Sequence, residues 1–448
     1  MIIERILILV MNMDSIWSKN EIPKFPPLQG DLKTDVLIVG GGMAGLLCAW
    51  ELNRQGVDYA LVEADRICRG VTRNTTAKIT TQHGKQYSRL ARQFGTEIAR
   101  GYWEANQAAL ERMVHLGKAL DCGLEQKDSY LYTLEPGALD EEMTALDALG
   151  ISAEYVEEAT LPFLVSGAIR IQNQAQFDPL RFAAEIAKGL RIYEHTPARE
   201  FAEKRVLTDS GQITAEKVII ATHFPILNKH GGYFLKLYQD RSYVIALENT
   251  GGLDGMYRDQ AAGGLSFREA RGKLLLGGGS HRTGKPGHGW TGLENQAKVF
   301  YPGARIVTRW ATQDCMSLDG IPYIGQYSPN TPGLFVATGF NKWGMTASMV
   351  SAMVLSNLVQ GKEDPWAEVF SPKRSIWRKQ LFLNAGESAL HLLRPTAPRC
   401  PHLGCALRWN PQERSWDCPC HGSRFNGDGK LLDNPATGDL RGGQRRKD

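Results

Sequence analysis

The chain has 448 residues, and this length predicts two or three packed units rather than one compact core. Apolar residues make up 42% and charged residues 22% of the chain, the balance of an ordinary soluble protein. The formal net charge is +4, and the tightest basic group is Arg445-Arg446-Lys447 at the C-terminal end. A charge this small and this evenly spread argues against nucleic-acid binding.

The first residues contain an apolar run, Ile6–Met11, that is too short to span a bilayer. The run also lacks the features of a signal peptide, because the charges before it are not net positive and no small-residue cleavage site follows. No twin-arginine export signal precedes it. We therefore expect a cytoplasmic protein without a membrane span, with Met11 or Met13 as an alternative start.

A glycine-rich turn joins a predicted strand to a predicted helix near the start of the chain. The apolar run Asp35–Val39 predicts the strand, Gly40–Gly45 follows it directly, and residues 46–52 have helical spacing. A second apolar strand, Tyr59–Val62, ends at Glu63. Strand, G-x-G-x-x-G, helix, strand and acid within about 30 residues form the dinucleotide-binding pattern.

Each glycine of this pattern has its own physical task. Gly40 makes the tight turn, Gly42 lets the backbone approach a pyrophosphate at the helix N-terminus, and Gly45 allows close packing of helix on strand. Glu63 can accept hydrogen bonds from a ribose 2′-hydroxyl and would repel a 2′-phosphate, which disfavours NADP. The pattern alone leaves FAD and NAD open. The predicted contacts are Gly40, Gly42, Met43, Ala44, Gly45 and Glu63.

Further segments carry a family resemblance. They are the small-residue run Arg69–Ala77, the strand Lys217–His223, and the pair Asp319–Gly325 and Gly333–Met345. With the glycine turn, they make residues 34–361 similar to the D-amino-acid oxidase and glycine oxidase superfamily of flavoproteins. The resemblance implies FAD as the cofactor and places the first run along the pyrophosphate and the flavin. Its predicted FAD contacts are Arg73, Asn74 and Thr75.

The last of these segments enters a glycine-flanked turn and then a helix, whose end aims N–H groups at whatever lies on the turn. In the family this partner is the O2/N1 edge of the flavin, where negative charge gathers on reduction. Lys342 and Trp343 stand where some amine oxidases of this fold have a Gly-His-Gly turn, and they are our candidate catalytic residues. We expect Lys342 to stabilise reduced flavin, with a surface lysine as the alternative. The predicted FAD contacts here are Gly339, Phe340, Asn341, Gly344 and Met345.

The chain's 8 cysteines are spread unevenly, with four scattered before residue 320 and four close together near the C-terminus. Such clustering in a cytosolic protein favours a metal site over a disulfide framework. Among the scattered four, Cys315 lies close to where some amine-oxidising relatives attach flavin covalently. A buried inert thiol is the favoured interpretation of Cys315.

The clustered cysteines fall in two boxes, Cys400-Pro-His402 and Cys418-Pro-Cys-His421. A Cys₂His₂ zinc finger would place its two Cys together and its two His together, whereas each box here holds both types. In a Rieske centre two Cys bind one iron and two His bind the other. The segment resembles the Rieske family, which implies Cys400 and Cys418 as thiolate ligands and His402 and His421 as imidazole ligands.

The same resemblance gives the remaining cysteines a role. Cys405 and Cys420 occupy positions that form a disulfide in many Rieske proteins, and Leu432–Ala436 resembles the proline loop that covers the cluster. A zinc site made from all four thiols is the alternative. Few residues separate Gly361 from Arg399, so the base strands that commonly precede the first box have little room. We expect an abridged Rieske unit that relies on packing against the flavoprotein.

The resemblances together predict an α/β fold: a Rossmann-like FAD-binding domain interleaved with an antiparallel-sheet substrate domain, then a small all-β Rieske-type subdomain. The expected divisions are an N-terminal extension at 1–28; the FAD-binding domain at 29–85, 160–225 and 305–362; the substrate domain at 86–159 and 226–304; a linker at 363–397; and the Rieske-type [2Fe–2S] subdomain with its tail at 398–448.

Flavin accepts two electrons as a hydride and can release them singly, and a Rieske centre carries one. We expect an FAD-dependent oxidoreductase that oxidises a small molecule, by resemblance at a C–N bond of an amine or amino acid. Electrons would pass singly through the cluster to an unknown acceptor. The alternatives are an NADH-fed reductase and a non-catalytic redox or iron sensor. A Rieske oxygenase is disfavoured because no Asp with two closely spaced His lies outside the boxes.

Overall fold

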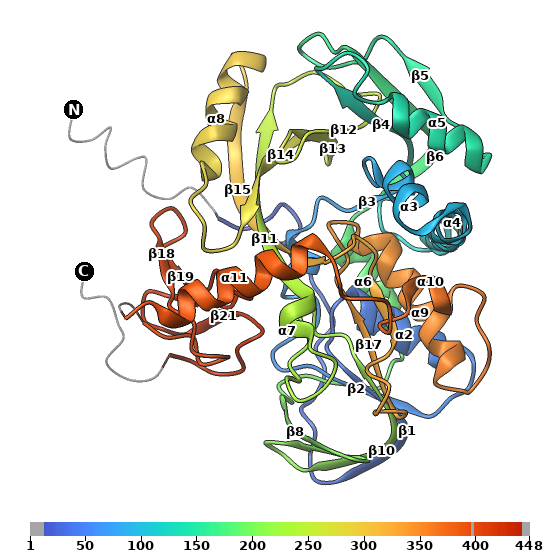
Figure 1. Ribbon diagram of the computed structural model, residues 1–448, viewed down its shortest axis with the longest axis vertical. Helices are drawn as coiled ribbons and strands as arrows, with labels where there is room; N and C mark the ends of the chain where they lie inside the picture. Colours follow the sequence, from blue (N-terminus) through green and yellow to red (C-terminus); the bar gives the residue numbers. More distant parts are fainter. Residues whose placement is uncertain (1–12, 396–397, 441–448) are drawn as a thin grey trace.

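The computed structural model describes residues 13–395 and 398–440, which form three sheets (Figure 1). The first sheet has the order β16-β17-β10-β1-β2-β7, with β9 paired to β10 and β8 to β9. The strands from β17 to β7 are parallel, as expected for a dinucleotide-binding sheet. Its strands are β1 (Leu32–Val39), β2 (Tyr59–Val62), β7 (Ile192–Tyr193), β8 (Ala198–Ala202), β9 (Arg205–Thr208), β10 (Gln212–Ile220), β16 (Tyr323–Gln326) and β17 (Leu334–Thr338).

The second sheet lies above the first in Figure 1 and is mainly antiparallel. Its order is β15-β11-β14-β13-β12-β4-β6-β3, with β5 paired to β6. Its strands are β3 (Lys78–Ile79), β4 (Glu125–Thr133), β5 (Glu154–Val156), β6 (Gly167–Gln176), β11 (Leu237–Glu248), β12 (Gly255–Asp259), β13 (Ser266–Ala270), β14 (Lys273–Arg282) and β15 (Arg305–Ser317).

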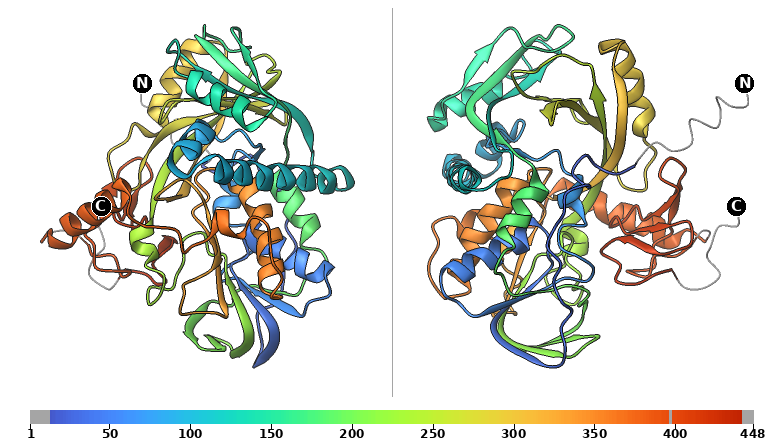
Figure 2. Two further views of the ribbon diagram at one scale, coloured as in Figure 1. Left: turned by 45° about the vertical axis from the view of Figure 1, so that its right-hand side comes forward. Right: turned by 180° about the vertical axis from the view of Figure 1, so that it is seen from behind.

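Helices cover both sheets (Figure 2). Two of them, α2 and α9, pack against each other beside the first sheet, and nearly every residue of α9 is buried. A helix that is apolar all round belongs in such a core. The helical elements are α2 (Met43–Arg54), the 3₁₀ turn η2 (Val71–Asn74), α3 (Gln86–Phe94), α4 (Thr96–Ala119), α5 (Asp140–Leu149), α6 (Pro179–Ile186), α7 (Tyr233–Lys236), α8 (Gly289–Phe300), α9 (Gly344–Leu358), α10 (Ala367–Phe370) and α11 (Lys379–Leu393). None in the described ranges is long and apolar enough to cross a membrane.

The sheet memberships differ from the expected domain divisions in three segments. Strand β6 pairs with β4, and β15 pairs along its whole length with β11, so both belong to the second sheet although residues 160–225 and 305–362 were assigned to the FAD-binding domain. The short β3, inside the expected 29–85 segment, also joins the second sheet. Alternating apolar residues predict a strand but not its partner, so the sequence pattern could not divide these segments.

The C-terminal residues 398–440, here called the cluster subdomain, form the third sheet. It contains β18 (Arg408–Asn410), β19 (Ser415–Asp417), β20 (Arg424–Asn426) and β21 (Leu431–Asp433) in sequential antiparallel order. Each strand has three residues, and the small core consists largely of the cysteines with Leu407, Phe425 and Ala436. Strands this short cannot hold a domain by themselves. The expected linker at 363–397 is largely helical, since α10 and α11 lie in it.

Strands β11 and β15 hold the cluster subdomain against the body through buried amides. The side-chain amide of Gln239 donates to the His421 carbonyl at 2.8 Å and to the Asn434 carbonyl at 3.1 Å. The amide of Gln313 donates to the Gly422 carbonyl at 2.8 Å. These bonds satisfy carbonyls of the cluster loops that the short sheet leaves free.

An ion pair buries charge at the same interface. Arg241 of β11 pairs with Glu413, which also binds Arg424 at 2.7 Å, and the Arg241 and Glu413 side chains are 7% and 5% exposed. Burial raises the pKa of Glu413, but the two guanidinium groups outweigh it and lower the pKa to about 2. The interface therefore depends on a charged Glu413.

Helix α11 joins the body to the cluster subdomain with its polar side inward. Asn384 accepts from Arg282 at 2.8 Å, and Glu387 pairs with Lys285 at 2.7 Å. The His391 carbonyl accepts from the Ala406 amide at 3.0 Å. Large apolar side chains, including Phe382 and Leu393, face outward. Polar contacts, not an apolar stripe, hold this helix in place.

We predict that Glu413→Gln destabilises the protein by about 3–5 kcal/mol, because it leaves the buried Arg241 without its carboxylate. Urea unfolding at neutral pH measures the loss. Glu216→Gln is the matched control, since the Glu216–Lys204 pair is exposed and its removal should change stability little. Equal stabilities of the two variants would contradict the role given to Glu413.

Candidate functional site

The glycine turn has the geometry that the sequence predicts. Gly40 has φ +111°, and a Cβ there would lie 2.6 Å from the Ala221 carbonyl oxygen. A Cβ on Gly45 would collide with the carbonyl oxygen of Gly40, so helix α2 packs too close to β1 for any side chain. A Cβ on Gly42 would meet only Thr72, at 3.6 Å. Internal packing thus requires glycine at 40 and 45, whereas Gly42 leaves its space to the cavity beside it.

Glu63 and Thr72 hold the start of α2. One carboxylate oxygen of Glu63 accepts from the Gly41 amide at 2.7 Å and the other from the Asp65 amide at 2.9 Å. Burial, the largest effect, raises the Glu63 pKa despite these bonds. The Met43 amide donates to the Thr72 hydroxyl at 3.1 Å. Glu63 therefore shapes the turn itself, besides facing the cavity where a ribose hydroxyl would lie.

A cavity of about 1130 Å³ runs from this turn to the second sheet, and we call it the main cavity. Its wall contains predicted FAD contacts from the N-terminal glycine turn and from the turn before α9. Those on the wall are Gly40, Gly42, Met43, Ala44, Glu63, Thr75, Phe340, Asn341, Gly344 and Met345, with the candidate catalytic residues Lys342 and Trp343. Gly45 and Gly339 lie behind the wall, in the packing of their turns.

Two predicted contacts point elsewhere. The Arg73 guanidinium binds Asp14 at 2.8 Å and Ser18 at 3.0 Å, and the Asn74 carbonyl accepts from Trp310 at 2.9 Å. Neither residue is part of the main cavity wall, whereas Thr72 and Thr75 are. The cause is η2, whose 3₁₀ turn directs neighbouring side chains to different sides. The small-residue run located this segment but not which of its side chains face inward.

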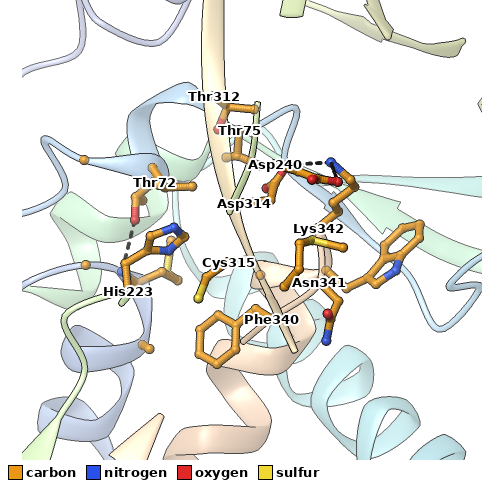
Figure 3. Close-up of a pocket in the computed structure, with 18 of the residues that line it drawn as sticks. Thr72, Thr75, His223, Asp240, Thr312, Asp314, Cys315, Phe340, Asn341 and Lys342 are labelled. Carbon is orange, nitrogen blue, oxygen red and sulfur yellow. Dashed lines mark hydrogen bonds and ion pairs between the residues drawn. The ribbon is translucent and has the colours of Figure 1, made fainter. Parts of the chain in front are cut away.

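The turn between β17 and α9 has an unusual backbone. Gly339, Asn341 and Lys342 have φ of +70°, +51° and +75°, and such values outside glycine concentrate at functional sites. The Asn341 side chain holds the turn, accepting from the Ser317 amide at 2.8 Å and donating to the Gly339 carbonyl at 2.6 Å. This turn and the start of α9 face the main cavity (Figure 3).

Lys342 is not a surface lysine, so that alternative is wrong. Its side chain is 16% exposed and lies beside Asp240 and Asp314 (Figure 3). The Nζ atom donates to Asp314 at 3.1 Å, to Ser280 at 2.8 Å and to Ser242 at 3.0 Å. Asp240 lies 3.9 Å away, and burial raises the pKa of its carboxyl. The sequence did not reveal these two acids, because β11 and β15 bring them to the lysine from distant parts of the chain.

Trp343 lies between two groups that sequence reasoning missed. Its ring stacks on His83 with centroids 4.5 Å apart, and the Arg258 guanidinium lies 5.2 Å from it. His83 bonds the Tyr102 hydroxyl at 2.7 Å and the Thr80 carbonyl at 2.8 Å, and burial lowers its pKa to about 3. Arg258 has no hydrogen bond or ion pair with any described residue, yet it lines the main cavity. An unpaired guanidinium in a cavity is suited to an anionic ligand.

Cys315 and His223 also line the main cavity. Burial raises the pKa of the Cys315 thiol to about 12, which favours the inert thiol over covalent attachment. His223 follows β10 with φ +65°, and its Nε2 is buried without a partner in the described residues. Figure 3 shows both side chains directed into the same space as Phe340.

The predicted iron ligands come together in the cluster subdomain. The His402 and His421 rings lie 4.9 Å apart at 87°, and Cys400 and Cys418 are in side-chain contact. The Nδ1 atoms of both histidines are buried without a partner among the described residues. Orphaned imidazole nitrogens beside paired thiols match the donor set of a Rieske [2Fe–2S] centre.

Cys405 is closer to this group than expected. Its sulfur, the sulfur of Cys418 and a ring nitrogen of His421 all lie within 4.8 Å of one another. The predicted Cys405–Cys420 disulfide is not formed: both residues are buried free thiols that contact each other. Cys405 also contacts Cys418, so it is shared between its expected partner and the ligand set.

The imidazoles face the body rather than open solvent. His402 Nε2 bonds Asn228 Oδ1 at 2.8 Å. The Phe224 ring meets both imidazoles edge-on, with centroids 6.3 Å from His402 and 6.2 Å from His421. The expected proline loop, Leu432–Ala436, also contacts Phe224, because the Asn434 side-chain amide donates to the Phe224 carbonyl at 2.9 Å. Residues of that loop also line the main cavity.

Comparison with known proteins settles the family. Residues 35–358 match the model of the FAD dependent oxidoreductase family, and residues 360–442 match the Rieske [2Fe-2S] domain. The chain belongs to the FAD dependent oxidoreductase family. These two domains bind FAD and a [2Fe–2S] cluster. Because the Rieske match begins at 360, it includes the helical stretch that was expected to be a linker.

Relatives support both parts. The chain is 34% identical to the Rieske 2Fe-2S iron-sulfur protein YhfW of Bacillus subtilis, covering 96% of this chain and 97% of the relative. It is 24% identical to glycine oxidase of Bacillus licheniformis over 76% of this chain and 97% of that protein. The glycine oxidase structure from Geobacillus kaustophilus superposes with a TM-score of 0.64 at 22% identity, covering 77% of this chain and all 100% of the other.

We predict that Gly42→Ala and Gly45→Ala separate binding from folding. Gly42→Ala should leave the stability of the apoprotein nearly unchanged and weaken FAD binding by at least about tenfold, because its Cβ takes cavity space. Gly45→Ala should lower the melting temperature of the apoprotein, because its Cβ meets the Gly40 carbonyl. Thermal melts and FAD titration by flavin fluorescence measure the two effects. Unchanged FAD affinity in Gly42→Ala would contradict the placement of the FAD pyrophosphate at this turn.

Proposed function

We propose that the chain oxidises a C–N bond of an amine or amino acid and passes the electrons singly through its Rieske cluster. The observation that carries the proposal is the loop Leu431–Thr437, which lines the main cavity and packs on the predicted cluster ligands. One loop thus touches the space for flavin and the space for the cluster. A flavin supplies a two-electron acceptor, and the cluster supplies a one-electron carrier.

The imidazoles of His402 and His421 contact residues of the flavoprotein body, and this supports electron transfer inside the chain. Phe224 and Phe234 cover His421, and Asn228 takes the outer nitrogen of His402. His223, next to Phe224, lines the main cavity. A path from cavity to imidazole therefore crosses neighbouring residues of one chain segment.

The wall of the main cavity supports a substrate that carries a carboxylate. Arg258 is the strongest feature, since burial lowers its pKa and no anion of the described chain binds it directly. Glycine oxidase and gamma-glutamylputrescine oxidoreductase among the relatives act, by their names, on an amino acid and on an amine that bears a carboxylate. The Trp343 ring, stacked on His83 and next to the Arg258 guanidinium, supplies an apolar surface beside Arg258.

Lys342 and Trp343 are proposed to act at the flavin. Lys342 brings a positive charge to the turn between β17 and α9, where negative charge gathers on reduction. Its contacts with Asp314 and two serines fix the Nζ position. Trp343 positions His83 and Arg258 rather than moving a proton itself.

Anaerobic spectroscopy of the purified protein tests the proposal. We expect flavin bands, a Rieske EPR signal after dithionite, and loss of that signal in Cys418→Ser and His421→Ala. Cys122→Ser is the matched control, because this buried thiol lies outside the cavity and the cluster subdomain and should leave the signal intact. Zinc as the only bound metal would contradict the cluster assignment.

Substrate reduction separates the proposal from its alternatives. Amino acids, N-methyl amino acids and diamines are added one at a time without oxygen, and we expect one class to bleach the flavin while the cluster EPR signal grows. In His421→Ala the flavin should bleach without that signal. Bleaching by NADH alone would indicate a reductase, and bleaching by neither would favour a sensor.

A further inference from the structure

Strand β3 places a lysine on the wall of the main cavity without an acidic partner. Lys78 Nζ donates to the Tyr257 carbonyl at 2.9 Å and to the Ser266 hydroxyl at 2.7 Å. No carboxylate of the described residues lies within ion-pair distance of it. A buried ammonium without an anion is costly, so the free amine is favoured here.

The charged groups that face Lys78 are both cations. Arg258 approaches from β12 and Arg268 from β13, and Arg268 is held by backbone carbonyls, including that of Ala77 at 2.7 Å. His83, after β3, is neutral because burial lowers its pKa to about 3. Burial first, and then the two guanidinium groups, lower the pKa of Lys78 well below its usual value.

The hydrogen bonds of Lys78 suit a neutral amine. A neutral amine has two N–H donors and one lone pair, whereas an ammonium group has three donors. The Tyr257 carbonyl and the Ser266 hydroxyl take two donors. The remaining position on nitrogen is left for a group inside the cavity, and a lone pair there can accept a proton.

We propose that Lys78 is the base that takes a proton from the ammonium group of a substrate bound through its carboxylate to Arg258. This inference rests on the proposed function and adds its proton step. An N–H bond of the substrate breaks, an N–H bond forms on Lys78, and the substrate amine regains its lone pair. The substrate carbon then loses a hydride, so the substrate is oxidised to an iminium and the flavin is reduced by two electrons. The proton on Lys78 afterwards passes to water.

Arg258 couples binding to this step. A carboxylate on Arg258 offsets one of the two positive charges that depress the Lys78 pKa. Lys78 therefore becomes a stronger base when the substrate arrives, which matches its basicity to the proton it must accept. An amine without a carboxylate would bind without this gain.

Kinetics of the FAD-loaded protein test the base. In the wild type, kcat/KM should fall as pH decreases through the Lys78 pKa. Lys78→Met should lower kcat/KM at pH 7 by about 100-fold or more, and the rate should recover as pH approaches the pKa of the substrate amine. Lys78→Arg should be equally impaired, because guanidinium stays protonated. The exposed Lys118→Met on α4 is the control and should match the wild type.

Chemical labelling gives a readout that does not depend on activity. Competitive acetylation with mass spectrometry measures the titration midpoint of each lysine in the holoprotein. We expect Lys78 to react with a midpoint well below that of Lys118, and acetate or Arg258→Met to raise it. A Lys78 midpoint equal to that of Lys118 would contradict the assignment of Lys78 as the base, and so would full activity of Lys78→Arg. Either result would count even if an amine bleaches the flavin. Failure of every amine to bleach the flavin would overturn the proposed function and the base together.

Discussion

Strand β11 is the element on which both halves of the site depend. Successive side chains of a strand point to opposite faces. Tyr238, Asp240 and Ser242 face the main cavity, while Gln239 and Arg241, between them, hold the cluster subdomain. Four strands of three residues cannot define the cluster loops alone, so the amide of Gln239 and the guanidinium of Arg241 complete them. The distance between the flavin space and the cluster space is thereby set by the thickness of one strand and its side chains.

The neighbouring strands also contact both the main cavity and the cluster subdomain. On β15, Thr312 and Asp314 line the main cavity while Gln313 reaches Gly422. On β14, Ser280 binds Lys342 and Arg282 reaches Pro419 at 3.0 Å. Strands β11 and β15 thus alternate between cavity and cluster contacts, whereas on β14 the two contacting residues are two positions apart, next to the register shift against β11. A shift of register by one residue would exchange the two faces, so the pairing of β11 with β14 and β15 is under strong constraint.

Features fixed by adjacent residues could be predicted from the sequence. The glycine turn and the cluster boxes are local, because their geometry depends on a few consecutive residues and their spacing. Lys78, Arg258 and Asp314 could not be found in this way, since β3, β12 and β15 carry them from separate parts of the chain into one cavity. The orientation of Arg73 could not be predicted for another reason: a 3₁₀ turn decides which side chain of a run faces inward, and composition does not encode that choice.

The distribution of charge in the main cavity gives a substrate one orientation. Arg258 and Lys78 have no ion pair with an acid of the described residues, although Asp259 and Asp314 act on Arg258 from nearby, and Asp240 and Asp314 surround Lys342 at the turn before α9. A carboxylate is drawn to the Arg258 guanidinium and repelled by the acids around Lys342. Under the proposed function, the substrate carbon next to the amine would lie between Arg258 and this turn, beside Trp343. The same burial that depresses the Lys78 pKa strengthens this orientation, because charges interact more strongly where water is excluded.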